Sequence, residues 1–440
     1  MKNITLLLLF CSTFLNAQLP DAYIINQVNS GFDYSMQSVF IENFTITAER
    51  DGNIFVSEDN VKREDPIVVR TPDTVGEGGL LSILHSNGDL WVYNTEAGTP
   101  KYGNISRYTL DLEANTSVFQ GDVLSEFFLY ASNHQGGTLM MDSEGWLYCS
   151  FGDAVNKWHA QRDSRLNGKI VRINAITGAG HPENPLYNAN NPFSAESRTY
   201  AKGMRNPFRC FMKDDIIYVF DVGSQSFEEA TIITEAGKNL GYPFYEGFEA
   251  YVGSVPTNPD TGNSYVLENY LEPIFALDHA TAGMVLPNST VLNFPFTPVS
   301  IIGGAILDNF GYPNGLLFMD VFKQNLLIAI LNDNNEVVEL VDLGEIGFQF
   351  VTHATQFDSK IYITRSNGEI FEVSYDETLS NNDVDFNYID AHKTYWSIGH
   401  EKFVSKMEIN TPYIIYYKYQ NRTKWKKRIY TSEASLFAQD

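Results

Sequence analysis

The sequence is poor in basic residues: its 440 residues include 30 lysines and arginines against 54 aspartates and glutamates, a formal net charge of −24. A chain so acidic repels polyanions, which excludes nucleic acid and anionic membrane surfaces as partners. After the first residues, no apolar run is long enough to span a bilayer. Long amphipathic helical stretches are nearly absent too, which argues against a parallel βαβ architecture.

The first 17 residues have the features of a secretory signal. Lys2 precedes an apolar run from Ile4 to Phe10, and a small residue stands at Ala17. The run is too short for a permanent membrane anchor, so we expect cleavage after Ala17 and a secreted or periplasmic protein with no membrane span.

Cysteine is scarce as well. Of the three cysteines, Cys11 would leave with the signal, and Cys149 and Cys210 remain. They can form a disulfide only if the fold brings them together, so the sequence leaves open a disulfide or two buried thiols. No pair of cysteines or histidines has the spacing of a zinc site.

What the chain does contain is a unit that returns six times: a turn residue followed by an apolar-aromatic-apolar core, typical of a short strand entered from a tight turn. The copies are Gly52–Ser57, Gly88–Tyr93, Gly145–Ser150, Asp215–Phe220, Gly315–Asp320 and Ser359–Thr364. Repeated sheet units with uneven insertions predict an all-β protein, a six-bladed β-propeller over residues 18–375, with the six copies in equivalent strands. The alternative is a pair of β-sandwiches.

Residues 376–440 differ in character and predict a linker followed by a small C-terminal β tail. Asn381–Asp385 looks like the linker, and Tyr413–Tyr419 with Thr423–Tyr430 form a hairpin pattern around Gln420-Asn421. Lys424–Arg428 is a basic cluster, which we interpret as a solvated edge strand rather than a binding patch.

Four segments carry more polar and glycine residues than packing requires. Asn133-His134-Gln135-Gly136-Gly137 places a histidine before two glycines, which allow a ligand to come close. Gly203–Phe208 presents Arg205 and Asn206 just before a proline. The other two segments are Gly76–Leu81 and Asp221–Glu229, the second offering carbonyls and glutamates suited to Ca²⁺.

In this order along the chain, these segments resemble the glucose/sorbosone dehydrogenase family over most of residues 43–375. Three further segments belong to the same ordered set: Gly152-Asp153, Asn167–Ile173 and Asn239–Gly247. The family consists of soluble quinoproteins: six-bladed propellers that bind pyrroloquinoline quinone (PQQ) and Ca²⁺ and oxidise aldose sugars to lactones, passing electrons to an acceptor. The resemblance therefore implies an aldose substrate, an electron acceptor and these two cofactors.

The resemblance also implies roles for individual residues. His134 would be the general base, and Arg205 and Asn206 would contact PQQ near its reactive carbonyl, Arg205 stabilising the negative charge. Glu77, Asn133 and Lys323 fall at further cofactor-binding positions. The metal ligands would be the carbonyls of Gly223 and Ser224 for the catalytic Ca²⁺, and Glu229 with the carbonyl near Leu240 for a second, structural Ca²⁺.

Two positions depart from the family pattern. Glu77 stands where active members carry glutamine or a comparable polar residue, and Gly347–Val351 has no arginine where glucose-oxidising members place an Arg-x-Arg pair for the PQQ carboxylates. The same superfamily includes proteins similar to the Hedgehog-interacting protein, which bind partners. The alternative function is thus a non-catalytic, Ca²⁺-stabilised propeller that binds a protein or glycan; a Ca²⁺-dependent hydrolase or lactonase is a third.

Overall fold

The computed structural model describes residue 19, residues 22–98, 101–308 and 310–376, and five strands of the C-terminal tail. The predicted signal segment and the predicted linker lie outside the described residues. Contacts divide the chain into Met1–Tyr375 and Asp376–Asp440. Within the described residues, no helix is long and apolar enough to cross a membrane.

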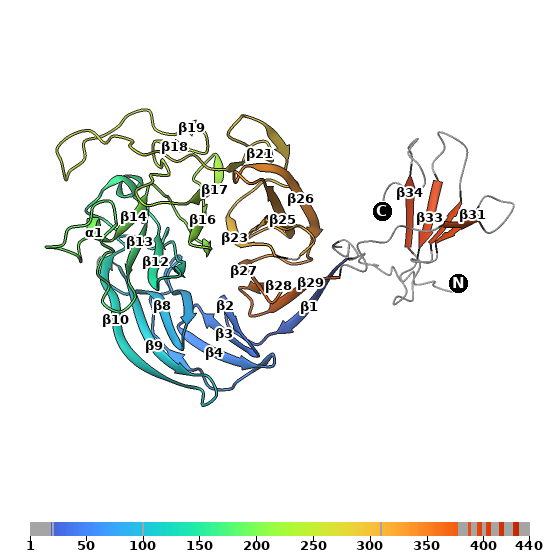
Figure 1. Ribbon diagram of the computed structural model, residues 1–440, viewed down its shortest axis with the longest axis horizontal. Helices are drawn as coiled ribbons and strands as arrows, with labels where there is room; N and C mark the ends of the chain where they lie inside the picture. Colours follow the sequence, from blue (N-terminus) through green and yellow to red (C-terminus); the bar gives the residue numbers. More distant parts are fainter. Residues whose placement is uncertain are drawn as a thin grey trace, which may run out of the picture. The chain divides into compact units, whose positions relative to one another are not determined.

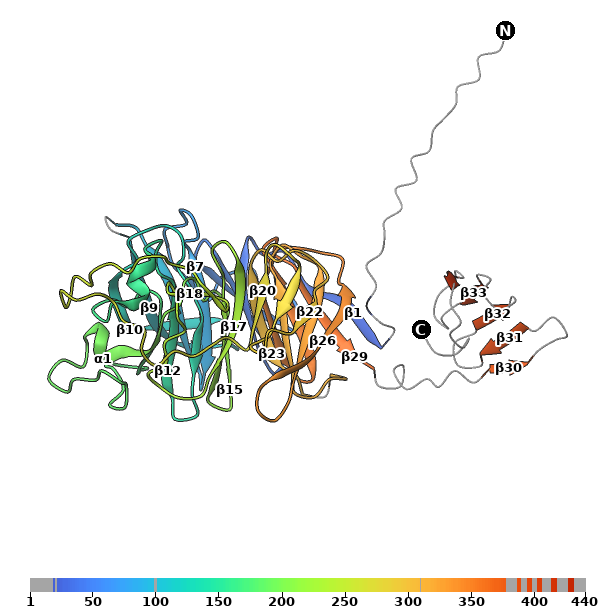
Figure 2. The ribbon, with the colours of Figure 1, turned by 90° about the horizontal axis from the view of Figure 1, so that it is seen from above.

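The first unit is a six-bladed β-propeller, as predicted (Figure 1). Six antiparallel sheets surround a common centre, and Figure 2 shows the ring from its edge. Blade 1 contains β2 (Ser35–Ile41), β3 (Phe44–Glu49), β4 (Asn53–Glu58), β5 (Val61–Lys62) and β6 (Val68–Val69). Blade 2 contains β7 (Leu80–Ser86), β8 (Asp89–Glu96), β9 (Tyr102–Asp111) and β10 (Thr116–Phe128). Blade 3 contains β11 (Leu139–Met141), β12 (Trp146–Phe151), β13 (Lys169–Asn174) and β14 (Thr199–Lys202).

Blade 4 has six strands and blades 5 and 6 have four each. The strands of blade 4 are β15 (Phe211–Lys213), β16 (Ile216–Asp221), β17 (Phe227–Ile233), β20 (Phe275–Asp278), β21 (Gly283–Val285) and β22 (Val291–Asn293). Those of blade 5 are β23 (Ile301–Ile306), β24 (Gly315–Asp320), β25 (Asn325–Leu331) and β26 (Val337–Glu345). Those of blade 6 are β27 (Val351–Phe357), β28 (Lys360–Arg365), β29 (Ile370–Tyr375) and β1 (Tyr23–Asn29). The remaining elements of this unit are the pair β18 (Tyr245–Glu246) and β19 (Glu249–Ala250), the 3₁₀ turn η1 (Lys157–Gln161) and helix α1 (Ala195–Arg198).

The ring closes through strands from opposite ends of the propeller. β1 pairs antiparallel with β29, with Tyr23 opposite Tyr375, so the first strand completes the last blade. This pairing supplies hydrogen-bond partners to the backbone N–H and C=O groups of β29, which would otherwise form an open edge of the last sheet.

The prediction that the six repeated units occupy equivalent strands is wrong for the first copy. Five copies lie on the second strand of their sheets, namely β8, β12, β16, β24 and β28, whereas Gly52–Ser57 lies on β4, the third strand of blade 1. Each sheet packs between two neighbours, so second and third strands are both buried on two faces and carry similar apolar runs. Local sequence therefore did not separate them.

The hydrophobic core is divided among the blade interfaces. Phe220 of blade 4 and Phe318 of blade 5 belong to one buried cluster, for example, and Tyr93 of blade 2 and Phe151 of blade 3 to another. Cys149 and Cys210 are buried free thiols, and burial raises the pKa of Cys210 to about 12. The structure therefore has two buried thiols at these positions and no disulfide.

Arg209 ties the inner strands of four blades together. It precedes β15 of blade 4 and is 1% exposed. Its guanidinium donates to the carbonyl oxygens of Thr352 on β27 (2.7 Å), Gly137 before β11 (2.6 Å) and Met36 on β2 (2.9 Å). No carboxylate among the described residues compensates its charge, and burial lowers its pKa to about 9.

The C-terminal unit contains an antiparallel five-stranded sheet in the order β30 (Phe386–Tyr388), β31 (Thr394–Ser397), β32 (Lys402–Ser405), β33 (Tyr413–Tyr417) and β34 (Lys426–Tyr430). The predicted hairpin corresponds to β33 and β34, which pair with Tyr413 opposite Tyr430. The three preceding strands were not predicted.

Candidate functional site

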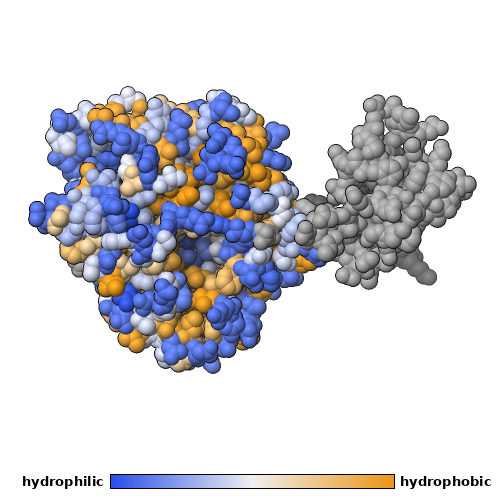
Figure 3. Space-filling view, in the orientation of Figure 1, coloured by the Kyte–Doolittle hydropathy of each residue, from blue (hydrophilic) through white to orange (hydrophobic). Residues whose placement is uncertain are grey.

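A pocket of about 420 Å³ opens among the loops that connect the inner strands of the propeller. The face of the ring drawn in Figure 3 is hollowed at its centre. Five of the predicted site residues line the pocket: Glu77, His134, Arg205, Asn206 and Gly223. Residues separated by more than 140 positions in the chain thus converge on one cavity.

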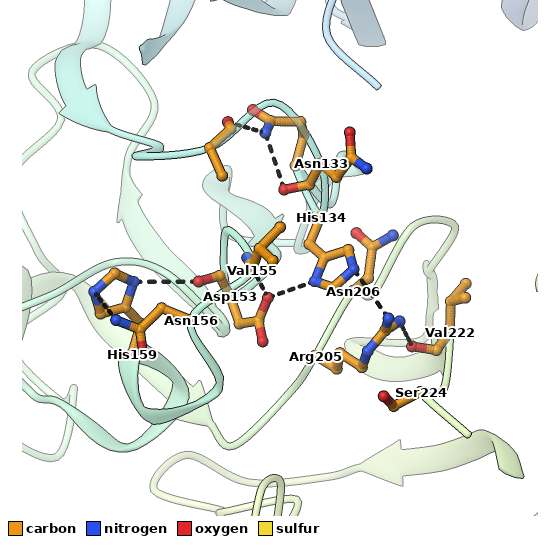
Figure 4. Close-up of polar contacts among 12 residues, drawn as sticks. Asn133, His134, Asp153, Val155, Asn156, His159, Arg205, Asn206, Val222 and Ser224 are labelled. Carbon is orange, nitrogen blue, oxygen red and sulfur yellow. Dashed lines mark hydrogen bonds and ion pairs between the residues drawn. The ribbon is translucent and has the colours of Figure 1, made fainter. Parts of the chain in front are cut away.

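His134 lies between a buried carboxylate and a guanidinium, as Figure 4 shows. Its Nδ1 is 2.6 Å from Oδ1 of Asp153, whose side chain is 1% exposed, and its Nε2 is 3.0 Å from Nη2 of Arg205. The carboxylate accepts and the guanidinium donates, so the hydrogen bonds assign the proton to Nδ1 and leave the lone pair on Nε2. This is the arrangement of an oriented general base.

The glycines after His134 are required by close contacts. His134 has φ 57° and Gly136 φ 67°, both in the left-handed region. A Cβ on Gly136 would lie 2.7 Å from the backbone nitrogen of Gly152, next to Asp153. The absence of a side chain lets the His134 loop pack directly on the loop that carries Asp153.

Asp221 positions the Arg205-Asn206 pair. Its Oδ2 accepts from the Arg205 amide at 2.8 Å and its Oδ1 from the Asn206 amide at 2.6 Å. Burial of this carboxyl raises its pKa to about 7 although both hydrogen bonds oppose the shift. The side chain of Arg205 donates to the carbonyl oxygen of Val222 (2.8 Å), and that of Asn206 accepts from the Gly136 amide (3.0 Å).

Glu77 joins two of the loops around the pocket. Its Oε2 accepts from the backbone amide of His134 (2.7 Å) and lies 3.4 Å from Nδ2 of Asn206. Its carboxylate is therefore engaged by donors of the protein.

Four buried carboxyl groups lie near one another around the loop of residues 222–226: Asp221 at the end of β16, Glu228 and Glu229 on β17, and Glu246 on β18. Oε1 of Glu246 accepts from four successive backbone amides, Ser224 to Phe227, at 2.7–3.3 Å, while its buried Oε2 has no partner among the described residues. Burial, with Asp221, Glu246 and Glu228 nearby, raises the pKa of Glu229 well above its usual range. Within the described part of the chain, no three or more His, Cys, Asp or Glu side chains are grouped to hold a metal ion.

The other predicted site residues do not line the pocket. Lys323 follows β24, and its ammonium lies 5.7 Å from the centre of the Phe296 ring. Asn133 precedes His134 and contributes its carbonyl to Gln135 (3.2 Å), and Leu240 donates its amide to the carbonyl of Lys202 (2.8 Å). The roles predicted for these residues, and for Ser224 and Glu229, remain predictions.

Four polar residues of the site were given no role from the sequence: Arg50, Asp153, Asp221 and Glu246. Asp153 and Asp221 stand inside family motifs, next to Gly152 and before Val222, but nothing local indicates what they contact. Arg50 lines the pocket from blade 1 and belongs to none of the four polar segments.

Comparisons with known proteins agree with this fold. Residues 32–293 match the family described as Glucose / Sorbosone dehydrogenase. The chain is 25% identical over 324 residues to the aldose sugar dehydrogenase YliI of Escherichia coli (strain K12), covering 68% of this chain and 78% of that protein.

Solved structures share the fold, and two of them are aldose sugar dehydrogenases. The soluble aldose sugar dehydrogenase of Escherichia coli in the apo-form superposes with a TM-score of 0.63 at 18% identity, over 80% of this chain and 99% of that one. The PQQ-bound aldose sugar dehydrogenase of Streptomyces coelicolor gives 0.59 at 17% identity, over 81% and 99%. Since the family match spans more than half of the residues, the chain belongs to the glucose/sorbosone dehydrogenase family.

Proposed function

We propose that this protein oxidises the anomeric hydroxyl of aldose sugars to lactones with PQQ and Ca²⁺, and delivers the electrons to an external acceptor. The observation that carries the proposal is the Asp153–His134–Arg205 arrangement, which orients the imidazole at the pocket with Nδ1 toward a carboxylate and Nε2 toward a guanidinium donor. The proposed chemistry requires a base of this kind beside the reacting hydroxyl.

His134 would take the hydroxyl proton on Nε2, after which Asp153 would stabilise the charged imidazolium through the bond to Nδ1. Arg205 donates to Nε2 in the structure, so the sugar hydroxyl would displace that donor or share Nε2 with it. The guanidinium would then stabilise the negative charge that develops beside it. PQQ, when bound, supplies the ring that accepts the hydride.

The lining of the pocket fits a flat anionic ring. Phe208, Phe322 and Tyr34 offer aromatic surface, and the guanidinium groups of Arg50 and Arg205 offer positive charge. Asn206 and the Arg205 side chain lie at the same wall as His134 and would hold the ring there. Glu77 is the one acidic side chain among the lining residues, and its Oε2 already accepts from protein donors.

A cation at the loop of residues 222–226 would be held by backbone oxygens, because among the described residues the carboxyl groups around it form no metal-ligand cluster. Four buried carboxyl groups lie near one another, and one oxygen of Glu246 has no hydrogen-bond partner among the described residues. A divalent cation at the Gly223 and Ser224 carbonyls would lower the cost of this buried negative charge. We also propose that residues 1–17 direct export, which would place the protein outside the cytoplasm.

The proposal is tested by adding PQQ and Ca²⁺ to the purified protein. We expect a bound-quinone absorbance band and dye reduction that depends on aldose. Arg205→Ala should weaken PQQ binding and slow turnover together, because this side chain would act on both the bound ring and the developing charge.

Arg63→Ala is the matched control, because its guanidinium pairs with Glu58 on the outer part of blade 1. It should leave both measurements unchanged. Absence of both quinone binding and sugar-dependent reduction in the wild type would reject the enzyme and favour the binding propeller.

A second expectation concerns Ca²⁺ and stability. Because a ligand that binds the native state stabilises it by mass action, chelation should lower the melting temperature of the Ca²⁺-loaded protein. Glu229→Ala should show a smaller response, whereas Glu235→Ala, at an exposed carboxylate paired with Lys238, should respond like the wild type. Identical melting curves with and without chelator would contradict the Ca²⁺ proposal.

A further inference from the structure

Arg50 is a pocket-lining cation that has no part in the proton transfer proposed above. It follows β3 of blade 1, and its backbone is fixed by two hydrogen bonds, from its amide to the carbonyl of Tyr34 (3.0 Å) and from the Leu80 amide to its own carbonyl (2.9 Å). It therefore approaches the pocket from blade 1, whereas Arg205 approaches from the loop before blade 4.

The loop of residues 74–78 holds the Arg50 side chain in one orientation. Nε donates to the carbonyl of Gly78 (2.8 Å), and Nη2 donates to the carbonyls of Thr74 (2.7 Å) and Gly76. The guanidinium carbon lies 5.1 Å from the centre of the Tyr34 ring. Nη1 has no hydrogen-bond partner in the part of the chain that the structure describes, so its donors are available to a ligand.

The charge of Arg50 is not neutralised by the protein. No carboxylate among the described residues lies within ion-pair distance of its guanidinium, although the chain carries a net charge of −24. Arg205 also makes its side-chain hydrogen bonds to neutral acceptors, Val222 and His134. The pocket thus contains two guanidinium groups with no carboxylate of the described residues within ion-pair distance, and one lining carboxylate, Glu77, which is already engaged.

We propose that Arg50 forms a carboxylate-binding subsite on the blade 1 side of the pocket, with Nη1 donating to the carboxylate and Tyr34 packing beside it. A preorganised guanidinium without an acidic partner is suited to this ligand class. This proposal rests on the proposed function, so the carboxylate belongs either to the PQQ ring or to an acidic aldose such as a uronic acid.

The test compares two ligand pairs that differ in carboxylate charge: PQQ with its trimethyl ester, and D-glucuronate with D-glucose. Dissociation constants are measured by fluorescence quenching and calorimetry on the wild type, Arg50→Gln and Arg50→Lys, with Arg63→Gln as the control and melting temperature as the check of folding. Loss of one charge-assisted hydrogen bond should weaken the carboxylate member of one pair by about 10- to 100-fold. The uncharged member should change little.

Loosening of the 74–78 loop would weaken both members of a pair equally, so the comparison separates charge recognition from loop support. A selective loss for PQQ assigns the subsite to the cofactor; a selective loss for glucuronate assigns it to the substrate. The second result, in a protein that neither binds PQQ nor reduces dye, would retain the subsite while rejecting the proposed function. Equal losses, no losses, or a wild type that binds neither PQQ nor glucuronate would overturn the inference.

Discussion

Replacing His134 by glutamine should leave PQQ binding largely intact and lower kcat with aldose by about 10²- to 10⁴-fold, the usual contribution of a positioned general base. Glutamine keeps a polar side chain at the pocket, but its amide cannot act as a base near neutral pH. Asp153→Asn should produce a loss of similar size, because an amide can donate to Nδ1 and favour the tautomer with its proton on Nε2.

The two variants should not be additive, since both remove the same function from one hydrogen-bonded unit. Single-turnover reduction of the bound quinone separates the chemical step from binding. Val155→Ala is a suitable control, because Val155 is exposed and only its amide contacts Asp153. A His134→Gln variant with wild-type kcat would show that the base lies elsewhere.

Arg209→Met should destabilise the propeller by roughly 3–5 kcal/mol, because three buried carbonyls lose their donor at about 1–3 kcal/mol each and the removal of a buried charge offsets part of that loss. Methionine fills much of the same volume, but it leaves the carbonyls of Met36, Gly137 and Thr352 without their donor. Those carbonyls belong to three different blades besides that of Arg209, so the centre of the ring should loosen as a whole.

Chemical denaturation followed by tryptophan fluorescence measures this effect. Arg63→Met removes a partly exposed arginine that pairs with Glu58 and donates to the carbonyl of Leu112, so its cost should be about 1–2 kcal/mol, well below that of Arg209→Met. Arg209→Lys, which can still donate to a carbonyl, should fall between the two. An Arg209→Met protein as stable as the Arg63→Met protein would contradict the role assigned to the buried guanidinium.

The repeated strands could be predicted from sequence because their burial is a local property. A strand such as Gly315–Asp320 is buried along its whole length, and it reads as a turn residue followed by apolar and aromatic side chains. The motifs, such as His134 before two glycines and Arg205-Asn206 before a proline, are weak singly, but their order along the chain can be recognised without a structure. Repetition and motif order together determined the fold class and the family.

Only the tertiary structure decided what these residues contact. The pairing of Tyr23 with Tyr375 joins opposite ends of the propeller, and no local pattern encodes such a register. For the same reason Gly52–Ser57 was assigned to the wrong strand, since a two-faced burial pattern does not distinguish the second strand of a blade from the third. Asp153 at Nδ1 of His134, Asp221 beneath Arg205 and Arg50 at the pocket wall meet their partners because ring closure brings different blades to one centre. The types of side chain and their spacing in the sequence indicate which chemistry is available. The closure of the ring determines which of those side chains face one another.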